Sequence, residues 1–140
     1  MASRQEKFPD TEAFHYYNAN PKGKYTGDCS FRAISLALGM DYNESVRERF
    51  EMFIETGIAP DTVEGEEKYL KAKGWVKHRQ PRKDNNQKYT GVEFCKEFKG
   101  TCVAHIGVHH AVCIKDGKIW DTWDSSDGCI GNYWTKGEEH

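Results

Sequence analysis

A cysteine that begins a predicted helix is the residue of this sequence whose setting best suits chemistry. Cys29 follows Gly27 and Asp28 and precedes a run of helix-forming residues, 30–38. Asp28 is a residue type that caps helices, so Cys29 is predicted to be the first residue of the helix. There the helix dipole favours thiolate over thiol, as a nucleophile requires. Burial as a small apolar residue is the common alternative for a free cysteine, and this segment alone does not separate the two interpretations.

A predicted β-hairpin much later in the chain carries histidines that could serve Cys29 as a base. Two segments rich in strand-forming residues, 109–115 and 118–124, flank Asp116 and Gly117. Asp-Gly between two such segments is typical of a two-residue hairpin turn. The hairpin would bring its histidines close to its carboxylates.

The register of this hairpin selects one histidine and one carboxylate. With Asp-Gly in the turn, His110 and Asp121 are diagonal neighbours on one face, close enough for the carboxylate to orient the imidazole. His109 and Asp124 fall on the opposite face. A shift of register by one residue would reverse the selection.

The chain order of these residues resembles that of papain-like cysteine peptidases. Four segments of the chain are together similar to a group of small cysteine-peptidase-like proteins of bacteria and phages. These are residues 16–23, the Gly-Asp-Cys ending at Cys29, His110 and residues 120–125. The segment around Cys29 also resembles the nucleophile block of ovarian-tumour-type deubiquitinases, with Thr26 where that family has its leading Asp. The resemblance implies an α+β, papain-like fold, with N-terminal helices packed on a C-terminal antiparallel sheet.

These residues imply a thiol hydrolase that cleaves amide or isopeptide bonds in a protein or peptide substrate. Cys29 would attack the acyl carbon, His110 would protonate the leaving amine, and Asp121 would orient His110. No cofactor is needed. The backbone N–H of Cys29 and the side-chain amide of Asn20 or Asn18 are candidates for stabilising the oxyanion, although Asn20 could instead form a turn with the following proline.

Three alternatives use the same residues differently. A deubiquitinase-like isopeptidase would need an extended docking surface, and an amidase or transglutaminase-type acyl transferase would differ only in the acyl acceptor. A non-catalytic binding module on the same fold would lack a reactive thiol. The charge of Asp28 beside Cys29 favours this last alternative, because it opposes thiolate formation.

Composition fits one soluble domain over residues 1–140, with residues 1–10 and 136–140 expected to be frayed. The net charge of −2 gives no sign of a polyanion partner, and no apolar stretch is long enough to span a membrane. The first residues lack the apolar core of a signal peptide, and the five cysteines show no paired short spacings. We therefore expect reduced thiols in a cytoplasmic protein.

Two clusters of chemically active residue types are interpreted as structural. Residues 95–113 hold several cysteines and histidines but no spacing typical of zinc ligands, so we predict no metal site. Residues 68–88 contain eight Lys or Arg and one acid, Asp84. A nucleic-acid contact is the functional interpretation of this basic segment, but the neutral total charge favours a solvated loop.

The remaining elements follow from caps and periodicity. Helices are predicted at 45–56, capped by Asp41 or Asn43, at 63–73, and after a capping Thr90. Strands are predicted at 101–107, in the hairpin and at 130–134.

Overall fold

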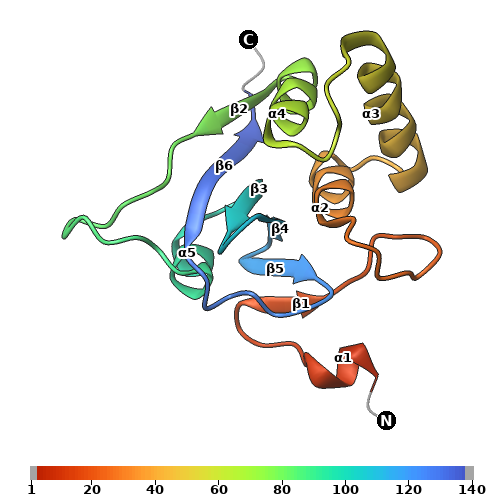
Figure 1. Ribbon diagram of the computed structural model, residues 1–140. Helices are drawn as coiled ribbons and strands as arrows, with labels where there is room; N and C mark the ends of the chain where they lie inside the picture. The colour runs from red at the N-terminus through yellow and green to blue at the C-terminus, as the bar shows by residue number, and fades with distance from the viewer. Residues whose placement is uncertain (1–2, 138–140) are drawn as a thin grey trace.

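A six-stranded sheet forms the centre of the molecule, and helices lie on both of its faces (Figure 1). The structure is a computed structural model, and it describes residues 3–137. The strand order is β1-β5-β4-β3-β6-β2; β1 and β5 run parallel and all other neighbours antiparallel. The strands are β1 (Phe14–Tyr16), β2 (Trp75–His78), β3 (Thr101–Ile106), β4 (His110–Lys115), β5 (Lys118–Asp121) and β6 (Ile130–Lys136). The helices are α1 (Arg4–Lys7), α2 (Cys29–Leu38), α3 (Tyr42–Thr56), α4 (Val63–Ala72) and α5 (Gly91–Glu97).

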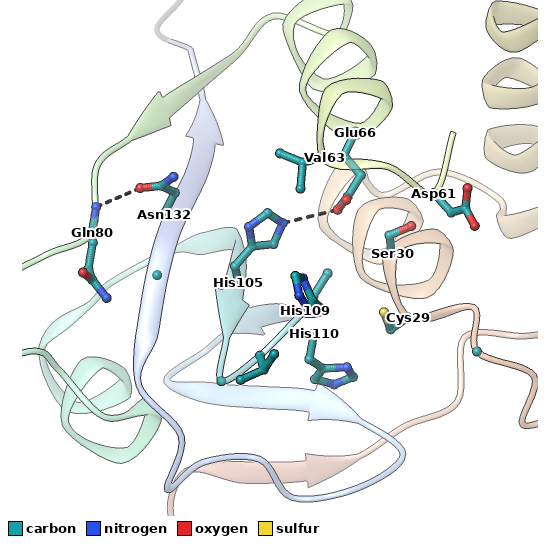
Figure 2. Close-up of a pocket in the computed structure, with 15 residues that line it drawn as sticks. Cys29, Ser30, Asp61, Val63, Glu66, Gln80, His105, His109, His110 and Asn132 are labelled. Carbon is teal, nitrogen blue, oxygen red and sulfur yellow. Dashed lines mark hydrogen bonds and ion pairs between the residues drawn. The ribbon is translucent and has the colours of Figure 1, made fainter. Parts of the chain in front are cut away.

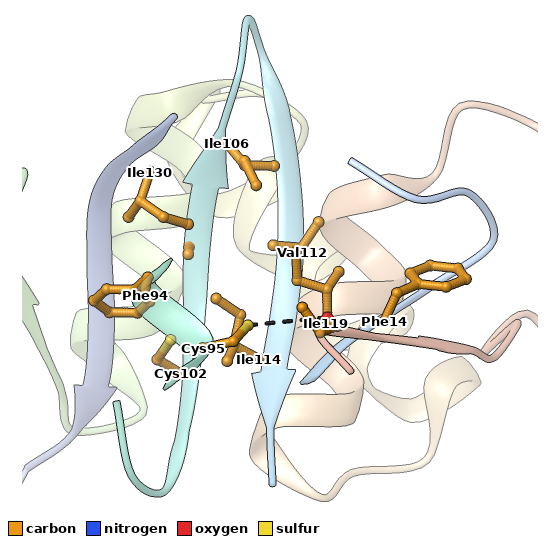
Figure 3. Close-up of a cluster of buried hydrophobic side chains, with 11 residues drawn as sticks. Phe14, Phe94, Cys95, Cys102, Ile106, Val112, Ile114, Ile119 and Ile130 are labelled. Atoms are coloured by element: carbon orange, nitrogen blue, oxygen red, sulfur yellow. Dashed lines mark hydrogen bonds between the residues drawn. The ribbon is translucent and has the colours of Figure 1, made fainter. Parts of the chain in front are cut away.

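Alternating side chains along the central strands divide the core into two layers. On one face of β3 and β4, side chains such as Ile106 and Val112 pack against Phe94 and Cys95 of α5 (Figure 3). On the other face, residues of the opposite parity pack against α2 and α4. These are Val103, Ala111 and Cys113 of the sheet, Ala33 and Ile34 of α2, and Tyr69 and Leu70 of α4. This second layer fixes α2, and therefore Cys29, against β4.

The three later helices begin at side-chain caps, of which Asp41 and Thr90 are among those predicted. The side chain of Asp41 accepts a hydrogen bond from the backbone N–H of Glu44, and Thr62 does the same for Gly65. Thr90 and Glu93 form a reciprocal capping box at the start of α5. The α+β class, these helices and the main antiparallel strands are confirmed.

The sheet differs from the expectation in being mixed. Neither β1 nor β2 was predicted from the sequence, and β1 adds a parallel edge strand next to β5. Both strands are short, and in β2 only Trp75 is buried, so neither has the alternating pattern of a half-buried strand.

The two ends of the chain also differ in part from the expectation of fraying. Residues 4–7 form α1, and Arg4 Nε donates to the backbone oxygen of Thr122 at 3.0 Å. Lys136 is the last residue of β6. Residues 1–2 and 138–140 lie outside the described part.

Among residues 3–137, no helix combines the length and the apolar character needed to cross a membrane. In the same range, no three His, Cys, Asp or Glu side chains are grouped as a metal ion would require.

Candidate active site

Cys29 is the first residue of α2, as predicted, but Asp28 does not cap the helix with its side chain. The Asp28 carboxylate instead accepts hydrogen bonds from Arg32 Nε at 2.9 Å, from the Tyr42 hydroxyl at 2.7 Å and from Asn20 Nδ2 at 3.1 Å. These donors hold the pKa of Asp28 below its usual range, although burial alone would raise it. The prediction of a side-chain cap was wrong, because three other donors occupy the carboxylate.

The hairpin that carries the histidine has the predicted turn and register. Lys115 pairs with Lys118 and Cys113 pairs with Trp120, leaving Asp116 and Gly117 as the two loop residues. Both loop residues have positive φ, 53° and 74°, as this class of tight turn requires.

His110 and Asp121 meet across this hairpin. His110 Nε2 donates to Asp121 Oδ2 at 2.6 Å, and the Asp121 side chain is only 2% exposed. The other carboxylate oxygen accepts from the backbone N–H of Thr122 at 2.7 Å and from Arg32 Nη1 at 2.5 Å. The Trp123 ring lies 4.7 Å from the imidazole, centroid to centroid. The imidazole is therefore held from several sides, and the selection of His110 and Asp121 by parity agrees with this geometry.

The thiol of Cys29 and the imidazole of His110 shift each other's proton affinity. Burial alone would raise the pKa of Cys29, but hydrogen bonding with the His110 side chain and the Ala111 backbone, together with the charges of His110 and Arg32, lowers it. Burial alone would lower the pKa of His110, but Asp121 and Cys29 raise it to about 9. The pKa of Asp121 stays below its usual range, because His110 and Arg32 outweigh its burial. Both directions favour the pair of thiolate and imidazolium over the pair of thiol and neutral imidazole.

Cys29 and His110 open into a cavity of about 640 Å³ between α2, α4 and the end of the sheet (Figure 2). Its wall includes Gly27, Ser30, Asp61, Val63, Glu66, Gln80, His105, Gly107, Val108, His109, Ala111, Gly131 and Asn132. A thiol at the edge of a cavity of this size is accessible to a ligand, since ligand sites are usually concave and of roughly 300–1,000 Å³.

His109 and Asp124 do not lie on the opposite face of the hairpin. His109 precedes β4, in the turn after β3, where it has a φ of 57° and lines the same cavity as Cys29. Asp124 follows the end of β5 and accepts a hydrogen bond from the backbone N–H of Ser126 at 2.9 Å. Parity does not apply to either residue, because neither belongs to a strand.

The two candidate oxyanion donors lie in the loop before α2 and not in the cavity wall. Asn18 Nδ2 donates to the backbone oxygen of Lys24, and Asn18 is half-buried. Asn20 is buried; its Nδ2 donates to Asp28 and its Oδ1 accepts from the backbone N–H of Lys22. The Asn20 side chain thus forms the turn and donates a hydrogen bond to Asp28. Of the candidate oxyanion donors, the backbone N–H of Cys29 at the start of α2 is the one whose residue lines the cavity.

Arg32 is the member of the site that the sequence analysis missed. It lies one helical turn after Cys29 and connects Asp28 to Asp121, two carboxylates that are far apart in the sequence. Its side chain is 11% exposed. The spacing of Asp28 and Arg32, four residues apart on a helix, was a signal for the first ion pair. The second depends on how α2 meets β5, which the sequence does not show.

Of the other cysteines, Cys95, Cys102 and Cys113 are buried, whereas Cys129 is exposed. Burial raises the pKa of Cys95 to about 11 and that of Cys113 to about 12. The basic segment is not one solvated loop as expected, because residues 68–72 belong to α4 and residues 75–78 form β2. Lys73, Lys77 and Lys83 of this segment form ion pairs with Glu48, Glu67 and Glu93, respectively.

Comparison of the chain with protein-family models, with curated proteins and with solved structures found no match.

Proposed function

We propose that this protein is a thiol hydrolase with a papain-like arrangement, which cleaves amide or isopeptide bonds through Cys29, His110 and Asp121. The observation that carries the proposal is that Cys29 and His110 line the same cavity while His110 Nε2 contacts Asp121 Oδ2 at 2.6 Å. A nucleophile, a base and a group that orients the base are the three parts of an activated-nucleophile site.

The proposed reaction has two halves. The Cys29 thiolate forms a bond to the acyl carbon, and the resulting oxyanion is stabilised by the backbone N–H of Cys29. The carbon–nitrogen bond then breaks, His110 gives its proton to the leaving amine, and a thioester remains on Cys29. In the second half, His110 takes a proton from water, the water oxygen attacks the thioester carbon, and the carboxylic acid leaves as Cys29 is regenerated.

The contacts of Asp28 weaken the case for a non-catalytic module. An aspartate next to the nucleophile would oppose thiolate formation if its charge were free. Here Arg32 Nε contacts that carboxylate at 2.9 Å, and both side chains are largely buried. The pair supplies a positive charge as well as a negative one near Cys29, and the Arg32 charge is among the causes that lower the pKa of the thiol.

The cysteine inventory supports a cytoplasmic setting for this chemistry. All five cysteines are free, which fits a compartment that keeps thiols reduced.

A peptide library tests the proposal. The protein is incubated with a mixture of unmodified peptides, and new amino termini are identified by mass spectrometry, with Cys29→Ala as the matched control. We expect cleavage by the wild-type protein alone. Repeating the reaction with an added alkyl primary amine compares acyl transfer with hydrolysis, because a transferase would form mainly the amide whereas a hydrolase would form mainly the carboxylic acid. Cleavage that persists in Cys29→Ala, or no peptide cleavage and no acylation of Cys29, would contradict the proposal.

A further inference from the structure

The cavity next to Cys29 contains a buried carboxylate that the proposed mechanism does not use. Glu66 of α4 lines the cavity, and its side chain is 9% exposed (Figure 2). Glu66 Oε1 lies 3.4 Å from His105 Nε2, at the long end of hydrogen-bond distances. No other residue in the described range donates a hydrogen bond to this carboxylate. A buried carboxylate with so few donors is suited to an additional cationic partner.

The nearest buried cation forms hydrogen bonds through one nitrogen only: in the described part of the chain, Nε and Nη1 of Arg49 have no hydrogen-bond partner. Arg49 is 1% exposed, and its Nη2 donates to Ser30 Oγ at 3.2 Å and to the backbone oxygen of Pro60. Its guanidinium also lies 4.1 Å from the centroid of the Phe31 ring. Within residues 3–137, Arg49 forms no ion pair with Glu66, and no Lys or Arg lines the cavity. Arg49 therefore offsets part of the local negative charge, but it leaves the Glu66 carboxylate without an ion pair to any Lys or Arg side chain that the structure describes.

The remaining wall has the features that a long basic side chain needs. Asp61 adds a second carboxylate to the cavity. Val63 and Val108 also line it and are 53% and 85% exposed, so they offer apolar surface at its opening. Lysine and arginine place their methylene stems against such surface while the charged end reaches a polar partner.

We propose that Glu66 is a specificity residue, which binds the cationic end of a lysine or arginine side chain close to the bond that Cys29 attacks. This inference depends on the proposed function, since it names the substrate class of the same site. It predicts a peptidase that prefers a basic residue within the two positions preceding the scissile bond.

Matched dipeptidyl chloromethyl ketones test this preference. In each pair, one probe has lysine and the other norleucine, which keeps the stem and lacks the amine, at either the first or the second position before the reactive carbon. The Cys29 thiolate displaces chloride and forms a thioether, so labelling is read as a mass increase on the Cys29 peptide. At one of the two positions we expect lysine to react about tenfold faster than norleucine, the size of effect that a charged hydrogen bond supplies.

Variants of α4 assign the preference to a residue. Glu66→Gln should reduce the lysine-to-norleucine ratio to near one. Glu64→Gln removes the same charge from an exposed residue of the same helix that does not line the cavity, and it should keep the ratio. The rate with iodoacetamide corrects each variant for differences in thiol reactivity.

The outcomes separate the two proposals. Equal rates for lysine and norleucine in the wild-type protein, or a ratio that Glu66→Gln does not change, would overturn the specificity inference while leaving a reactive Cys29 intact. The wild-type comparison is decisive even if Glu66→Gln does not fold. If Cys29 reacts with iodoacetamide no faster than the exposed Cys129, it is the proposed function that fails.

Discussion

Arg32 donates from Nη1 to Asp121 Oδ1 at 2.5 Å, while His110 Nε2 contacts the other oxygen of the same carboxylate at 2.6 Å. Asp121 is therefore fixed between a helix residue and a strand residue. Because Arg32 lies on the same helix as Cys29, this contact ties the helix that carries the thiol to the carboxylate that orients the imidazole. The contact resists a small movement of α2 at the point where geometry matters most for the proposed reaction.

Replacing Arg32 with Met should reduce kcat/KM by about 100-fold, the size of effect that a misplacement near 1 Å can produce. It should also move the pH midpoint of Cys29 alkylation upward, because Arg32 lowers the pKa of that thiol. The second readout separates positioning from a loss of folded protein. Arg47→Met on the exposed side of α3 is the control and should behave as wild type. An unchanged midpoint in Arg32→Met would contradict this role.

The three residues of the proposed triad should lose activity unequally. Cys29→Ala and His110→Ala each remove a group that takes part in bond making or proton transfer, so each should lower kcat by roughly 10⁴-fold or more. Asp121→Asn removes only the charge that orients the imidazole of His110. The reduction of kcat should therefore be roughly 10- to 100-fold smaller than in the other two variants. Turnover of any cleaved peptide measures the series.

Two comparison variants accompany this series. His78→Ala on β2, whose ring contacts Thr135 and Tyr133, should keep activity. His109 is not suited to that purpose, because it lines the cavity. If Asp124→Asn abolished turnover while Asp121→Asn did not, the assignment of the orienting carboxylate would be wrong.

Much of this site could be predicted from short-range patterns. A Gly-Asp-Cys before helix formers placed Cys29 at the start of α2, and Asp-Gly fixed the hairpin register. That register in turn paired His110 with Asp121. Each of these predictions depends on neighbours in sequence or on the period of a strand, which local chemistry determines.

The parts that were missed depend on contacts between distant segments. Arg32 reaches Asp121 only because α2 packs on β4 next to β5, and no periodicity encodes that contact. Asp28 is a residue type that often caps helices with its side chain. Here its carboxylate instead accepts hydrogen bonds from Tyr42 and Asn20, which lie in other segments. His109 was assigned to a strand because the start of β4 is one residue later than the pattern of strand formers indicated.

Cys29 should be the fastest of the five cysteines to react with iodoacetamide near neutral pH. Cys129 is the informative comparison, since it is exposed, and we expect Cys29 to react at least about tenfold faster because its pKa is lowered. Cys95, Cys102 and Cys113 are buried with raised pKa values and should remain unmodified. Brief labelling followed by peptide mapping measures all five. Modification of Cys129 before Cys29 would argue against a nucleophile at position 29.

The pH dependence of turnover should be bell-shaped, because the active form needs a thiolate on Cys29 and a proton on His110. Turnover should rise as pH passes the Cys29 pKa, which lies below its usual value of 9.0, and should fall as His110 loses its proton at about 9. Alkylation of Cys29 should show only the rising limb, since it requires the thiolate alone. In His110→Gln the midpoint of this limb should move to higher pH, because the imidazolium that stabilises the thiolate is absent. His78→Gln provides the control and should leave the midpoint where it is. A wild-type alkylation midpoint at 9 or above would mean that His110 does not activate Cys29, and the base would then have to be sought among the other histidines that line the cavity.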